Sequence, residues 1–131
     1  MDYGMAVRTA ASFADTVARV RDALKDQGFG VLTEIDVRAT MHEKLGEEME
    51  DYLILGACNP PLAHRALAAD RHVGLLLPCN VVVRAADGGG TIVEALDPRA
   101  IADIAGEPAL RSVADEAAIR VQAALAAISG E

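Results

Sequence analysis

The segment from Tyr52 to Cys58 constrains the fold most, because every position in it is apolar or small and Asn59 and Pro60 follow at once. A run of this length is typical of a strand, and apolar residues at odd and even positions alike predict cover on both faces. Asn59 is a favoured N-cap, and Pro60 suits the first helical position because its missing N–H would have no partner there. The sequence therefore predicts a central strand that leads directly into a helix ending near Asp70.

Periodicity and turn residues predict the remaining elements on either side of this strand. Further strands are expected at residues 3–9, 29–36, 73–84 and 91–96, with a hairpin turn at 87–90. Further helices are expected between Ser12 and Gly28, between Asp36 and Gly46, between Asp97 and Gly106, and from Pro108 to about Ile128. This order, β-α-β-α-β-α-β-β-α-α, predicts a single α+β domain over residues 1–131, with helices packed on a mixed β-sheet.

Composition and charge exclude several classes of function. The net charge of −8 argues against nucleic-acid binding, which needs a basic surface, and against docking on anionic membranes. No apolar run approaches the roughly twenty residues of a membrane-spanning helix. The first residues also lack the basic start and apolar stretch of a secretory signal. We therefore expect a cytoplasmic protein that binds neither nucleic acid nor membrane.

The two cysteines, Cys58 and Cys79, are expected to be free thiols in such a chain. Cys58 precedes a predicted helix N-terminus, where the dipole and free N–H groups favour a thiolate or a small anion. The alternative is that Cys58 is a small buried hydrophobe. Cys79 follows Pro78, which interrupts the predicted strand and is expected to leave backbone near Cys79 and Asn80 unpaired for a ligand. The alternative is that Pro78 only kinks an edge strand.

Spacing makes a geometric prediction about the two thiols. If strands 52–58 and 73–84 pair in parallel, with Tyr52 opposite Val73, then Cys58 lies opposite Cys79, because each cysteine follows six residues later. An antiparallel pairing of the same strands would separate the thiols by on the order of 20 Å. Only the parallel arrangement is then expected to make one site from both cysteines.

His64 lies in the first turns of the predicted helix after Cys58, where an imidazole could act as a base or a third metal ligand. The alternative is a surface histidine. The two cysteines and His64 do not match a zinc-finger or zinc-ribbon spacing, although two thiolates could hold a soft metal such as Cu(I). Phosphate-loop, hydrolase and protease motifs are absent from the sequence. The sequence therefore identifies no reaction and no cofactor.

An ordered series of motifs resembles the DUF302 family, a prokaryotic family of unknown function. The motifs are Lys44-Leu45-Gly46, the segment from Tyr52 to Pro60, the segment from Leu75 to Val83, and Asp97-Pro98. The resemblance implies a single α+β domain, similar in outline to the TATA-binding-protein fold, and a homodimer. The acidic charge argues against transferring DNA binding with that fold. The family positions in this sequence are Gly56, Cys58, Asn59, Pro60, Pro78 and Cys79.

Three hypotheses about function follow. The first is a site that binds a small ligand, such as an anion, or supports thiol-dependent redox chemistry, with Cys58 and Cys79 as catalytic candidates. Its ligand-binding candidates are Gly56, Asn59, Pro60, His64, Pro78 and Asn80. The second is a dimeric interaction or regulatory module without catalysis, and the third is a soft-metal-binding protein.

Overall fold

In the computed structural model, which describes residues 1–129, five strands form one sheet in the order β1-β5-β4-β3-β2. Every neighbouring pair in this sheet is antiparallel. The strands are β1 (Gly4–Thr9), β2 (Gly30–Asp36), β3 (Tyr52–Cys58), β4 (Cys79–Ala85) and β5 (Thr91–Leu96).

The helices begin where the sequence places capping side chains. They are α1 (Phe13–Asp26), α2 (Val37–Leu45), α3 (Pro60–Ala69), α4 (Pro98–Ala105) and α5 (Arg111–Ser129), with 3₁₀ helices η1 (Arg71–Leu76) and η2 (Pro108–Leu110). The side chains of Ser12, Asp36, Asn59 and Asp97 each accept a backbone N–H from the first turn of the helix that follows. These bonds satisfy donors that have no partner inside the helix.

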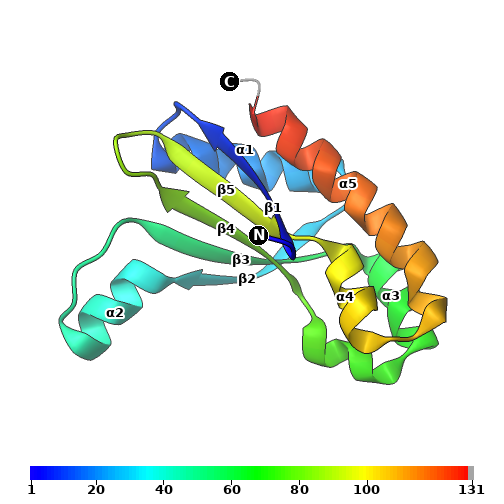
Figure 1. The fold of residues 1–131 in the computed structure, drawn as a ribbon. Helices are drawn as coiled ribbons and strands as arrows, with labels where there is room; N and C mark the ends of the chain where they lie inside the picture. Colours follow the sequence, from blue (N-terminus) through cyan, green and yellow to red (C-terminus); the bar gives the residue numbers. More distant parts are fainter. Residues whose placement is uncertain (130–131) are drawn as a thin grey trace.

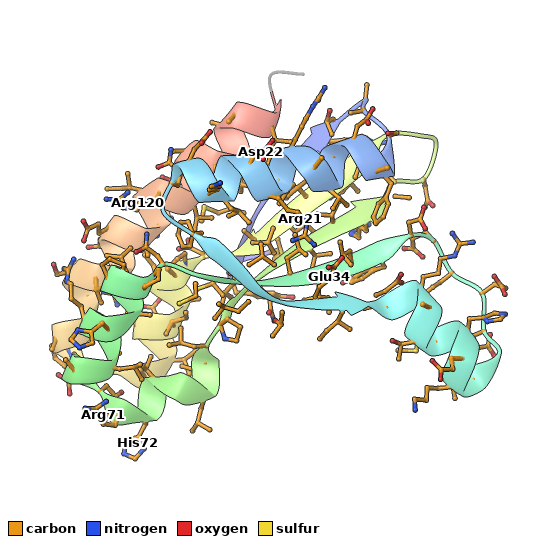
Figure 2. All side chains as sticks on the ribbon, turned by 180° about the vertical axis from the view of Figure 1, so that it is seen from behind. Arg21, Asp22, Glu34, Arg71, His72 and Arg120 are labelled. Carbon is orange, nitrogen blue, oxygen red and sulfur yellow. The ribbon has the colours of Figure 1, made fainter. Side chains whose placement is uncertain are left out.

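Figure 1 shows α1 and α5 over one face of the sheet, α3 and α4 together at one end of the strands, and α2 at the other end. An ion pair between Arg21 and Glu34, 2.8 Å long, joins α1 to β2 and is visible in Figure 2. No helix within residues 1–129 is both long and apolar enough to cross a membrane.

The predicted α+β class and the predicted order of helices and strands are confirmed, but two details of the sheet differ. The sheet is antiparallel throughout rather than mixed. The predicted strand 73–84 is also wrong in its first part, because residues 71–76 form η1 and β4 begins only at Cys79. Asp70 accepts the N–H of His72 at 2.9 Å and starts this 3₁₀ turn. Pro78 then has no N–H to donate to a β ladder, so the strand begins after it.

The main core lies between the sheet and the two helices α1 and α5. On β3, Leu53, Leu55 and Ala57 are buried in this core. Tyr52 and Ile54 point to the other face and are only partly buried. The prediction that β3 is covered on both faces is therefore wrong within the single chain, and we call this second surface of the sheet the open face.

A second apolar cluster lies beyond the ends of β3 and β4, among the short helices and the start of α5. Its buried members are Leu62, Ala66, Val73, Ile101, Ala102, Leu110, Val113 and Ala114. Cys79 packs against this cluster. The fold thus places the candidate site at the junction of the sheet and the second cluster.

Candidate functional site

A pocket of about 370 Å³ lies where β3 ends and β4 begins. Its walls come from α3, η1, α4 and the first half of α5, and the end of the sheet closes it on one side. The second apolar cluster forms most of these walls, so the same residues that hold the short helices together also surround the empty volume. The six alanines among its walls keep the side chains short and leave this volume open: Ala57, Ala63, Ala66, Ala102, Ala114 and Ala117.

The walls of the pocket are almost entirely hydrocarbon. None of the lining residues, all of which belong to the described part of the chain, carries a charge. Asn59 supplies the amide among them, and Cys58 and Cys79 supply the thiols. A pocket of this size and chemistry is suited to a small apolar molecule, because a charged group inside it would lose its water without gaining a partner.

Both cysteines line this pocket, although the chain directions differ from those expected. Cys79 pairs with Ala57 across the antiparallel β3–β4 ladder. Cys58 is the next residue of β3, so the two thiols reach the same end of the sheet without the parallel pairing that the spacing suggested. The two thiols lie at the same end of antiparallel strands because β4 begins at Cys79 and not at residue 73 as predicted.

The thiols nevertheless do not form a disulfide, and both are free. Successive strand residues point to opposite faces, so Cys58 points away from the face that Ala57 and Cys79 share. Burial, together with the nearby Cys58, raises the pKa of the Cys79 thiol from 9.0 to about 11. Cys79 is therefore protonated at neutral pH, and this environment gives no support to a role as nucleophile.

Asn59 is buried, and its side chain links the start of α3 to the end of α1. Its side-chain oxygen accepts the N–H of Leu62 at 3.4 Å, and its side-chain nitrogen donates to the carbonyl of Gln27 at 3.3 Å. Arg120 of α5 donates to the same carbonyl at 3.4 Å. A Cβ atom at Gly28 would lie 3.0 Å from the Asn59 amide, so the chain after α1 passes close by. Asn59 thus holds the start of α3 against the end of α1.

The first turn of α3 has no spare N–H group for an anion. Pro60 and Pro61 lack an N–H, the N–H of Leu62 is bound by the Asn59 side chain, and that of Ala63 donates to the Asn59 carbonyl at 2.8 Å. Pro60 itself is exposed, and it is not among the residues that line the pocket. The donors on which the hypothesis of a small anionic ligand relied are therefore already used in residues 60–63.

Gly56 and Pro78 have a packing relationship that explains both positions. A Cβ atom at Gly56 would lie 2.8 Å from Cγ of Pro78 and would also overlap the hydroxyl of Thr33. Glycine is needed here because the proline ring and the neighbouring strand approach the β3 backbone closely. Pro78 also lines the pocket, whereas Gly56 does not.

His64 and Asn80 are placed away from the pocket. His64 is exposed on α3 and is not among the lining residues, so the structure does not place it as a base or ligand beside Cys58. Asn80 pairs with Gly56 in the β3–β4 ladder, so the backbone there is not left unpaired as expected. Its side chain is exposed on the open face, beside a separate hollow lined also by Tyr52 and Val82.

Sequence reasoning missed the walls that α4 and α5 contribute. Ile101, Ala102, Val113 and Ala114 line the pocket as well as being buried. Their signal in the sequence is a helical stripe of apolar and small residues, which is also the signal of an ordinary core. The stripe locates buried helix faces, but it does not reveal that the space between them is unfilled.

The structure gives the soft-metal hypothesis nothing beyond the two thiols. Across residues 1–129, no three His, Cys, Asp or Glu side chains gather in a way that could hold a metal ion. Because His64 is not in the pocket, no third ligand accompanies Cys58 and Cys79 there.

Comparison with known proteins gives a consistent result. The chain is similar over 98% of its length, with 30% identity and a TM-score of 0.91, to the crystal structure of an uncharacterized conserved DUF302 protein from Bacillus stearothermophilus, of which it covers 99%. No curated protein matches the chain. Residues 5–128 match the family model described as domain of unknown function DUF302. The chain therefore belongs to the DUF302 family.

Proposed function

We propose that this protein binds a small apolar molecule in the pocket beside Cys58 and Cys79. The observation that carries the proposal is the unfilled volume of about 370 Å³ inside the second apolar cluster. Pockets of about this volume with apolar walls are typical of sites for small molecules.

The surroundings of the thiols favour binding over thiol chemistry. Burial raises the pKa of the Cys79 thiol to about 11, so this sulfur lines the pocket as a neutral, polarizable surface. His64, the side chain considered as a base, is exposed outside the pocket. In this proposal the cysteines are contact residues for an apolar ligand.

The test uses N-phenyl-1-naphthylamine, an uncharged dye that becomes fluorescent in apolar surroundings. We expect saturable fluorescence with the purified protein. We also expect at least about a tenfold loss of affinity when Ala63→Met and Ala117→Met together fill the pocket, since both residues line it and are only partly buried. The matched control is Ala123→Met, an exposed position of α5 outside the pocket, which should bind like the native chain. Absence of dye binding, or unchanged binding in the filled variant, would reject the proposal.

A second candidate, a dimeric interaction module, is favoured by the open face. Tyr52 and Ile54 make β3 apolar on this side, and both are only partly buried. Helix α2 adjoins the same region and has no buried residue, with Met41 36% and Leu45 68% exposed. A short helix gains most of its stability from packing, so α2 and the open face both lack a partner in the single chain. In a dimer with a two-fold axis, α2 of each copy would cover the open face of the other copy.

The oligomeric state tests this second candidate. We expect sedimentation of a dimer, and a shift to monomer when Ile35→Glu and Leu45→Glu place charges on the exposed apolar positions of β2 and α2. Ile119→Glu is the matched control, because Ile119 is 66% exposed on α5 and lies on the helical side of the sheet. A monomeric native chain would reject the dimer, and a dimer that survives both charges would reject this interface.

A further inference from the structure

Two cations on the helices around the pocket are already engaged by carboxylates, and Arg120 of α5 donates to the carbonyl of Gln27. Arg65 of α3 pairs with Glu116 of α5, and Arg111 of α5 pairs with Asp103 of α4. These ion pairs join the walls of the pocket on their outer sides. An incoming carboxylate would have to displace a carboxylate of the protein to reach either guanidinium.

The other cations near this end of the molecule do not turn toward the pocket. Arg99 binds the side chain of Asp97 through both Nε and Nη2, at 2.8 to 3.2 Å. Arg71 and His72 of η1 are exposed, and Figure 2 shows both side chains directed away from the body of the protein. Neither residue is among those that line the pocket.

Backbone donors in the first turn of α3 are also committed. The first turn of α3 contains two prolines, and the next two N–H groups donate to Asn59. The thiol of Cys79 stays neutral at physiological pH because its burial disfavours the charged form. The lining of the pocket therefore offers an anion no cation, and the first turn of α3 offers it no free backbone N–H.

Resting on the proposed binding function, we infer that this pocket selects uncharged apolar ligands and discriminates against carboxylates of the same chain length. Its volume of about 370 Å³ has room for roughly a dozen groups the size of a water molecule or a methylene. A medium-length aliphatic alcohol fits inside these limits. The corresponding carboxylate either loses its hydration without a partner or leaves part of its chain outside.

The experiment compares 1-octanol with sodium octanoate as competitors of N-phenyl-1-naphthylamine at pH 8. We expect octanol to displace the dye at a concentration at least about tenfold lower than octanoate, because the carboxylate finds no compensating partner. Octanoate that competes within about twofold of octanol would overturn the inference and leave the proposed binding function intact. Failure of both the dye and octanol to bind would instead reject the proposed function.

Two further measurements distinguish selection by the pocket from the effect of the protein's net charge. The net charge of −8 repels any anion, but 0.5 M sodium chloride screens this long-range effect. We expect the preference for octanol to persist in that salt, and its disappearance would assign the preference to net charge and overturn the inference. The variant carrying Ala63→Met and Ala117→Met should lose octanol binding, whereas retained binding would place the alcohol elsewhere and also overturn it.

Discussion

Replacement of Asn59 by alanine gives the sharpest test of how the site is built. The substitution removes the N-cap bond to Leu62, which at 3.4 Å is long and contributes at most about 1 kcal/mol. It also removes the bond to the carbonyl of Gln27, a neutral hydrogen bond worth about 1 kcal/mol. The side chain is buried, so water does not readily replace either bond. We therefore expect the free energy of unfolding to fall by about 2 kcal/mol.

Urea and thermal unfolding followed by circular dichroism measure this loss. For a chain of this length, about 2 kcal/mol corresponds to a fall in Tm of about 7 °C. Asn59→Asp is the informative control, because it keeps the oxygen that caps Leu62 but replaces the donor to Gln27 with a carboxylate. This variant should lose at least about 1 kcal/mol. A loss below about 0.5 kcal/mol in Asn59→Ala would refute the argument, since it would show that neither bond stabilises the fold.

Three further predictions concern the residues around the pocket. Gly56→Ala should destabilise the fold by about 1–3 kcal/mol, because the added Cβ overlaps Pro78 and Thr33. Adding Pro78→Ala should recover part of this loss. If urea unfolding shows that the losses of the two substitutions add, the contact between the two positions is contradicted. In Cys58→Ser, alkylation of the remaining thiol by iodoacetamide should stay slow near pH 8 and rise at higher pH, because burial, the larger cause of the raised pKa of Cys79, persists in this variant. Rapid alkylation of the folded protein at pH 8 would refute this. The free energy of unfolding should also fall by up to about 2 kcal/mol between about pH 9 and 11, because the Cys79 thiol ionises at a lower pH in the unfolded chain than in the folded protein. Urea titrations at each pH should show that Cys79→Ala loses this part of the pH dependence. The same fall in the variant as in the native chain would contradict the assignment to Cys79.

Much of the local structure could be predicted because its causes lie within a few residues. Ser12, Asp36 and Asn59 cap the helices that were expected to follow them, and each accepts an N–H three residues further along. Gly46 and Gly106 end α2 and α4 in the left-handed conformation that glycine adopts without strain. Capping and turn formation depend on neighbouring residues, so the sequence is sufficient to locate them.

The direction of β3 and β4 could not be predicted from local patterns. The apolar run after residue 72 resembles a strand, but its first part forms η1 once Asp70 accepts the N–H of His72. This shortens the strand to Cys79–Ala85 and allows an antiparallel return beside β3. Strand pairing depends on contacts between distant segments, which a period of two along one segment does not specify.

Local patterns along the chain are sufficient to predict the order of helices and strands, their caps, and the two motifs that place Cys58 and Cys79 at strand ends. The packing of distant segments brings these ends together at one pocket, holds Asn59 there by hydrogen bonds and places His64 outside it. The same packing leaves no room for a Cβ atom at Gly56 beside Pro78. It also leaves one face of β3 open. An apolar stripe identifies the side chains that avoid water, whereas the space between stripes depends on how helices distant in sequence pack together.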